Sequence, residues 1–176
     1  MPMPVRRIVT HNNAQGRSQV LTDAIADNCT GTLTELWTTG SEPHDHDTTI
    51  DHGATSPSLL PPAGGTVFRY FEIPPESQSA HLSTEERAKN WADLFQRMNA
   101  PHIQPDISRD PGMHKSDTTD YIILLKGSIT LVLDEGEVEL KPLDVVVQRG
   151  TNHSWVNRGS ENALLMGVLV DARTGA

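Results

Sequence analysis

The sequence predicts an all-β fold, an antiparallel sandwich or barrel that carries one short helix. Six runs of about strand length crowd into the second half of the chain, separated by turn formers, at 121–125, 128–133, 137–140, 145–148, 153–157 and 163–170. Runs of this length and spacing are typical of antiparallel sheets. A second observation favours a closed sheet, because His114, Ser116 and Asp120 in one stretch and His153 in another converge only where the sheet curls into a barrel.

Length and composition favour one soluble domain over residues 1–176. The chain has 176 residues, enough for a single core, and its 14 Lys and Arg against 23 Asp and Glu give a formal charge of −9. A charge of this sign repels phosphate backbones and anionic lipid, so we expect neither nucleic acid nor membrane as a partner. The single cysteine, Cys29, fits a reducing compartment. The start MPMPVRRIVT lacks the apolar run of a signal peptide, and we expect a cytoplasmic protein.

The first half, residues 1–73, reads as N-terminal strands and a long loop. Short runs rich in β-branched or apolar residues, separated by Asn and Gly, predict three strands at 5–9, 18–22 and 32–37. Residues 38–65 are rich in Ser, Thr, Pro, Gly, Asp and His without periodicity, which indicates a loop or lid over the scaffold. The run 66–73 predicts a fourth strand, which Pro74 and Pro75 end.

One helix is predicted between the two sets of strands, over residues 83–98. Ser83 and Glu86 form a capping box at its start. Apolar residues then recur at helical spacing, at Ala88, Trp91, Ala92, Phe95 and Met98. The helix therefore runs roughly from Thr84 to Met98 and buries one face.

Two motifs in the second half resemble the cupin superfamily. The first reads His-x-Ser, three residues, Asp, six residues, Gly, at His114, Ser116, Asp120 and Gly127, and the second reads Gln-x-Gly-x-x-His-x-x-x-Asn at Gln148, Gly150, His153 and Asn157. The string DVVVQRGTNHSWVN looks like a group of small single-domain, RmlC-like cupins of bacteria and fungi. The resemblance covers residues 110–172 most clearly. It implies a jelly-roll β-barrel with an internal pocket and, as is common among small cupins, a homodimer.

The chain departs from the cupin metal set at two of its positions. The resemblance implies metal ligands at the two histidines of His-x-His, the Glu and the second-motif histidine, but Ser116 replaces one histidine and Asp120 replaces the Glu. His114, Asp120 and His153 remain as a two-histidine, one-carboxylate set of the kind that binds iron, manganese or zinc. A barrel without metal is an equal alternative, in which the same three residues are catalytic as acid and base groups.

Strand parity indicates which side chains line the pocket. Ile122 lies two residues after Asp120 and Trp155 two after His153, so both face the interior and, with Ser116, are candidates to contact substrate. For Trp155 a packing role is an equal alternative. Arg149 is placed in the turn before Gly150, and Leu143 stands where the second motif normally has glycine.

A further histidine cluster, His44, His46 and His52, lies within the long loop. The pair His44-x-His46 has the literal first-motif spacing, but its flanks are loop formers without strand-like context. A solvated acidic loop is therefore favoured over a second metal site.

Three functions share the same candidate residues. The first is a lyase or isomerase, such as a decarboxylase, dehydratase or cyclase, that acts on a small oxygenated organic acid or carbonyl compound. The second is a non-haem iron oxygenase at His114, Asp120 and His153. The third is a non-catalytic barrel that binds a small ligand. We expect the first, because acid and base chemistry survives a weakened ligand set better than oxygen activation by iron does.

Overall fold

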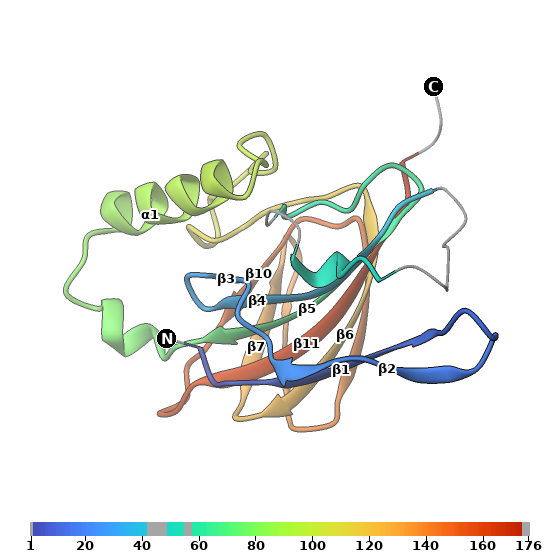
Figure 1. Ribbon diagram of the computed structural model, residues 1–176. Coiled ribbons are helices and arrows are strands. Elements are labelled where there is room, and N and C mark those ends of the chain that lie inside the picture. Colours follow the sequence, from blue (N-terminus) through green and yellow to red (C-terminus); the bar gives the residue numbers. More distant parts are fainter. Residues whose placement is uncertain (1, 42–48, 55–57, 174–176) are drawn as a thin grey trace.

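The computed structural model describes residues 2–41, 49–54 and 58–173 and consists mainly of antiparallel strands (Figure 1). The strands of the first half are β1 (Arg6–Asn12), β2 (Ser18–Ile25), β3 (Cys29–Thr30), β4 (Leu33–Thr39) and β5 (Thr66–Ile73). Those of the second half are β6 (Thr118–Lys126), β7 (Ile129–Leu133), β8 (Glu137–Leu140), β9 (Val145–Arg149), β10 (His153–Val156) and β11 (Ala163–Asp171). Helix α1 (Thr84–Arg97) and two 3-10 turns, η1 (His52–Ala54) and η2 (Glu76–Ser79), lie between them. The predicted all-β class with one short helix is confirmed.

The predicted elements lie close to the observed ones, with a few differences. The pattern does not reveal β3, because two residues are too few to show alternation. Arg149, predicted in a turn, is instead the last residue of β9 and pairs with Thr119. Of the histidine cluster in the long loop, His52 begins η1, while His44 and His46 lie outside the described residues.

Two sheets face each other and form the barrel. The larger has the order β3-β4-β5-β11-β6-β9 and the smaller the order β10-β7-β8, and every strand pair is antiparallel. A core cluster fills the space between the sheets, with Ile122, Leu124, Ile129, Leu131, Leu140, Trp155, Ala163 and Leu165 as its buried members. Helix α1 lies across one end of this arrangement (Figure 1).

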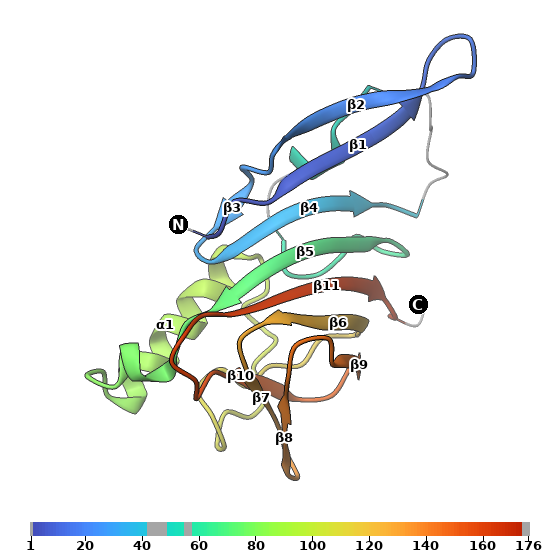
Figure 2. The ribbon, with the colours of Figure 1, turned by 90° about the horizontal axis from the view of Figure 1, so that it is seen from below.

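The hairpin β1–β2 forms a sheet of its own beyond β4 (Figure 2). The Arg7 side chain joins it to the barrel, because its Nη1 donates to the Leu36 carbonyl at 3.0 Å and to Asp51 Oδ1 at 2.7 Å. A second core cluster, with Ala26, Leu36, Tyr70 and Leu164 as its buried members, packs against the partly buried Val5 from the start of the chain. The N-terminal segment is thereby attached to the larger sheet.

The second motif has a structural role at both of its ends. Gly150 adopts a φ of 58°, which glycine reaches more easily than other residues. The Asn157 side chain donates to the carbonyls of Ile73 at 2.7 Å and Glu161 at 2.8 Å, and so links the segment after β10 to the end of β5. Within the described residues, no helix is both long and apolar enough to cross a bilayer.

Candidate functional site

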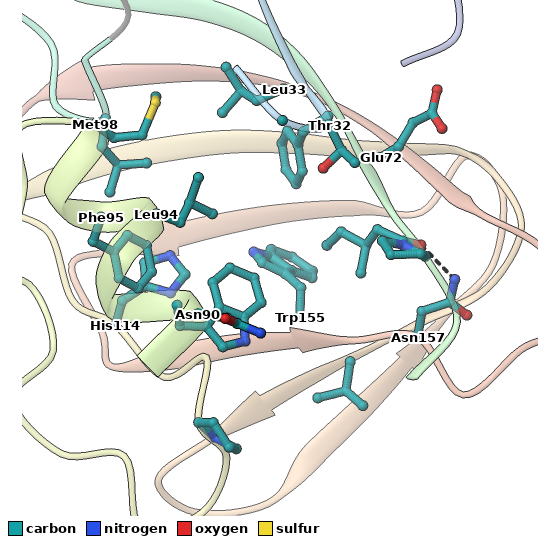
Figure 3. A pocket seen from close by; sticks show the side chains of 18 of the residues that line it. Thr32, Leu33, Glu72, Asn90, Leu94, Phe95, Met98, His114, Trp155 and Asn157 are labelled. Atoms are coloured by element: carbon teal, nitrogen blue, oxygen red, sulfur yellow. Dashed lines mark hydrogen bonds between the residues drawn. The ribbon is translucent and has the colours of Figure 1, made fainter. Parts of the chain in front are cut away.

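A cavity of about 530 Å³ lies inside the barrel, beneath α1. Its lining comes from both sheets and from the helix, and Figure 3 shows Leu94 and Phe95 of α1 beside His114 and Trp155 of the barrel. Among the predicted site residues, His114, Asp120, Ile122, His153 and Trp155 line the cavity. The helix predicted only to bury one face is therefore also part of the cavity wall.

The two histidines lie side by side on this wall, with their rings tilted by 46°. His114 and His153 form a β-bridge, in which each backbone N–H donates to the carbonyl of the other at 2.8 and 2.9 Å. Their ring centroids are 4.3 Å apart. The backbone pairing explains why residues 39 positions apart meet, and it confirms the convergence that the sequence predicted for these two side chains.

Both rings are fixed in the same way. Nδ1 of His114 is 2.9 Å from the Gly112 carbonyl, and Nδ1 of His153 is 2.9 Å from the Thr151 carbonyl. Because a carbonyl can only accept, Nδ1 carries the proton in each ring and the lone pair lies on Nε2. Neither Nε2 has a hydrogen-bond partner among the described residues, so both are available to a ligand.

Burial keeps both imidazoles neutral. Desolvation and, to a smaller extent, the neighbouring His114 lower the pKa of His153 to about 3, against the hydrogen bond to Thr151, which raises it. Desolvation also lowers the pKa of His114, against the hydrogen bond to Gly112, which acts in the opposite direction. Because a charge on one ring also disfavours a charge on the other, burial and the contact between the rings both favour the neutral pair.

A row of five aromatic rings runs along the cavity from the helix to the barrel. Trp91 stacks on Phe95 at 5.7 Å, Phe95 lies 5.2 Å from His114, and His153 meets Trp155 edge to face at 5.8 Å. With the 4.3 Å contact between the histidines, the row is continuous. Such a wall favours apolar or flat ligands, because aromatic faces supply large contact areas.

Gly112 allows α1 to approach the histidine loop, which is the segment 110–114 that carries His114. A Cβ atom at this position would lie 2.9 Å from both Trp91 Cε2 and Ser154 Oγ. Asp110 fixes the same loop, since its Oδ1 accepts from the Gly112 N–H at 2.8 Å and from Ser154 Oγ at 2.6 Å. The loop therefore holds the carbonyl that orients His114.

The carboxylate of Asp120 does not join the histidines. No group of three metal-ligating side chains occurs among the residues that the structure describes. Asp120 instead interacts electrostatically with Arg69, and burial raises its pKa to about 6 against the lowering effects of Thr118 and Arg69. The three predicted metal ligands thus do not fit a shared metal ion in this arrangement, and of the three only the two imidazoles are in contact with each other.

The remaining predicted contacts divide between cavity and core. Ser116 is absent from the cavity lining, and its hydroxyl bonds to Thr118 Oγ1 at 2.7 Å. Ile122 and Trp155 do line the cavity, and Gly167 makes room for Ile122, whose Cδ1 lies 2.5 Å from where a Cβ would be. Strand parity therefore placed these two side chains correctly on the inner face.

Sequence reasoning missed Arg69, which lines the cavity at 2% exposure. Its Nη2 donates to Glu35 Oε1 at 2.8 Å in a buried ion pair. The run TVFRYFEI contained a signal for it. Arg69 alternates with Val67 and Phe71, so its side chain lies on the same face of the strand as these two apolar residues. Its partner Glu35 could not be inferred, because the pairing of β4 with β5 joins residues far apart in sequence.

Comparison with known proteins finds relatives over part of the chain, while no family model matches it. Phomopsin biosynthesis cluster protein C' of Diaporthe leptostromiformis is 57% identical over 47 residues, which are 26% of this chain and 25% of that protein. A cupin-domain-containing oxidoreductase of Neurospora crassa is 40% identical over 65 residues, 35% of this chain and 33% of its own length. One of Aspergillus ruber is 35% identical over 63 residues, 34% of this chain and 31% of its own.

The chain thus spans a quarter to a third of the length of these curated relatives. Among solved structures, a cupin 2 conserved barrel domain protein of Salinispora arenicola is 18% identical over 61% of this chain and 64% of its own, with a TM-score of 0.38. The relatives that carry the cupin name confirm the resemblance to the cupin superfamily that the two motifs predicted.

Proposed function

We propose that the chain is a small-molecule enzyme of the lyase or isomerase kind, in which His114 and His153 exchange a proton with a carbonyl compound held in the cavity. The main support is the position of the two rings, 4.3 Å apart on the cavity wall with Nδ1 fixed and Nε2 directed to no protein group among the described residues. A cavity of about 530 Å³ is large enough for a small organic substrate.

The chemistry follows from two neutral bases in an apolar site. Nε2 of one ring takes a proton from the carbon next to the substrate carbonyl, and the electron pair of the broken C–H bond forms an enolate with its charge on the carbonyl oxygen. The imidazolium that forms is disfavoured by burial and by the second ring. It therefore returns the proton readily. Return to a different carbon gives an isomer, and transfer to a departing hydroxyl gives a dehydration.

Deuterium exchange tests this proposal without knowledge of the natural substrate. 1-Tetralone has one aromatic ring, one carbonyl and exchangeable hydrogens beside it, and NMR in D₂O follows their replacement. We expect the wild-type protein to accelerate exchange at least about 100-fold over the variant with both His114→Gln and His153→Gln, the usual contribution of a positioned acid or base. His102→Ala, at an exposed position outside the cavity lining, is the matched control.

Equal exchange by wild-type protein and the double variant would contradict the proposal. It would leave a barrel that binds a ligand without acting on it. Circular dichroism of the double variant shows whether the fold persists, so that lost exchange is assigned to lost imidazoles.

An oxidoreductase is the second candidate, because relatives in Neurospora crassa, Aspergillus ruber and Hypocrea virens carry that word in their names. Here a redox metal held by His114 and His153, with solvent or substrate as further ligands, would supply the electron transfer. Elemental analysis of protein purified without chelator distinguishes the two. Stoichiometric iron that is lost in His153→Gln favours the oxidoreductase, whereas full tetralone exchange after removal of all metal favours the proton-transfer enzyme.

A further inference from the structure

A second polar region of the cavity lies around Arg69 and Asp120, and the proposed chemistry at the histidines does not use it. Arg69 is 2% exposed and Asp120 is 6% exposed, and both line the cavity. Glu35, 3% exposed and outside the cavity lining, accepts a hydrogen bond from Arg69. Three ionisable side chains from β4, β5 and β6 therefore meet in an otherwise apolar interior, which is costly unless each polar atom finds a partner.

Each of the three side chains has one buried atom without a partner. These atoms are Glu35 Oε2, Arg69 Nε and Asp120 Oδ1. The other two guanidinium nitrogens of Arg69 donate hydrogen bonds. Nη1 donates to the Leu59 carbonyl at 3.0 Å, and Nη2 donates to Glu35 and to the Ser58 carbonyl. The guanidinium is thus rigidly held while part of the cluster's hydrogen-bonding capacity is unused.

Arg69 and Asp120 interact electrostatically but form no ion pair within 4.0 Å. Two buried opposite charges without a direct ion pair are both satisfied by a group that bonds to each of them. Such a group must accept from a guanidinium N–H and donate to a carboxylate, which a hydroxyl does with a single oxygen atom.

Charge decides between a hydroxyl and the alternatives. The cluster contains one guanidinium and two carboxyl groups, so a carboxylate on the ligand would meet Asp120 and Glu35 at close range. An ammonium group would satisfy Asp120 but would offer no acceptor to Arg69. A hydroxyl satisfies both and adds no charge.

We propose that Arg69 and Asp120, supported by Glu35, form a subsite that binds a hydroxyl group of a flat, mainly apolar ligand. The inference rests on the proposed function only in taking this cavity as the substrate pocket. It narrows the substrate class expected from the sequence, a small oxygenated acid or carbonyl compound, to a hydroxylated neutral one. The aromatic row from Trp91 to Trp155 then contacts the apolar part of the same ligand.

Four matched probes test the subsite, each with one methyl-bearing benzene ring and a different para substituent, which is polar in three of them and a second methyl group in the fourth. They are 4-methylbenzyl alcohol, 4-methylbenzoate, 4-methylbenzylamine and p-xylene, and ligand-observed NMR titration gives their dissociation constants. We expect the alcohol to bind at least about tenfold more tightly than each of the other three, the difference that a fully satisfied hydrogen-bonding site supplies over an unsatisfied one.

Asp120→Asn assigns the selectivity to this cluster. We expect it to weaken alcohol binding about fivefold or more and to strengthen benzoate binding, because a charge-assisted hydrogen bond and a repulsion are removed together, while p-xylene binding stays unchanged. Asp27→Asn, at an exposed position outside the cavity lining, is the control and leaves all four constants unchanged.

Several outcomes would overturn the inference. They are failure of every probe to bind, benzoate or amine binding as tight as alcohol binding, and an order of affinities that Asp120→Asn leaves unchanged. The test needs no turnover, so it is separable from the proposed function. Alcohol selectivity without tetralone exchange would support the subsite and contradict proton transfer at the histidines. Tetralone exchange without alcohol selectivity would support proton transfer and contradict the subsite.

Discussion

At the residue scale, Leu143 occupies the position where the second motif normally has glycine, and its backbone is strained there. Its φ is 77°, and it follows Pro142 in a turn closed by the Asp144 N–H, which donates to the Lys141 carbonyl at 3.0 Å. A turn with Pro second and a positive φ third is a type II turn, which favours glycine at the third position. The glycine that the motif normally carries therefore has a conformational reason.

Replacement of Leu143 by glycine is expected to stabilise the protein. The side chain is 77% exposed, so little packing is lost, while release of a left-handed backbone gains about 1 kcal/mol after the entropy of glycine is subtracted. Urea denaturation followed by circular dichroism measures the change. A loss of stability would show that the Leu143 side chain contributes more than its exposure indicates.

The buried histidines predict how stability depends on pH. The folded pKa of His153 is about 3, below its ordinary value of 6.5, so the unfolded chain takes up the proton first and stability is lost as pH falls below 6.5. Asp120 has a folded pKa of about 6 against an ordinary 3.8, so its protonation stabilises the folded protein as pH falls. This contribution cancels when wild-type protein is compared with His153→Gln, because both contain Asp120. Between pH 6.5 and 5, wild-type protein is expected to lose more stability than His153→Gln, by about 1 kcal/mol per pH unit. Equal losses in urea titrations at the two pH values would contradict this.

At the element scale, α1 does more than its amphipathic pattern indicates. Its start is fixed by the predicted capping box, in which Glu86 N–H donates to Ser83 Oγ at 3.2 Å and the Glu86 carboxylate accepts from the Ser83 N–H at 2.7 Å. Its inner face places Trp91 and Phe95 against the histidine loop. The helix therefore lines one side of the cavity and contributes two rings, Trp91 and Phe95, to the aromatic row.

The contact between helix and loop is tested by Gly112→Ala. The added methyl would overlap Trp91 and Ser154, so we expect a loss of stability of about 1–3 kcal/mol and displacement of the His114 ring, with slower tetralone exchange. Gly40→Ala is the matched control, because no atom lies within 4 Å of the added methyl there. If both variants unfold at the same urea concentration, Gly112 is not required for this packing.

Local pattern predicted most of the elements but only part of the site. Apolar runs of strand length bounded by turn residues predicted the strands, and the capping residues predicted the start of α1, because these signals depend on neighbours in sequence. The meeting of His114 and His153 was predicted from the barrel, since both lie on motifs of fixed spacing. The position of Asp120 was not, because it depends on Arg69, which lies on β5 and carries no motif.

At the scale of the whole molecule, the barrel separates two chemical environments within one cavity. Neutral imidazoles and aromatic rings form one wall, and the Arg69 cluster forms a buried polar region. The homodimer expected from the cupin resemblance stays a prediction. Ile8, Val20 and Ile25 of the β1–β2 hairpin, 53%, 56% and 55% exposed, offer apolar surface to a second copy.

We propose that His114 and His153 act together as a proton-transfer pair inside this barrel. The most direct test is the rate of deuterium exchange into 1-tetralone by wild-type protein, divided by the rate for the double His114→Gln, His153→Gln variant. We expect a ratio of at least about 100, the least that a positioned acid or base contributes. A ratio near one, with the variant folded, would contradict it.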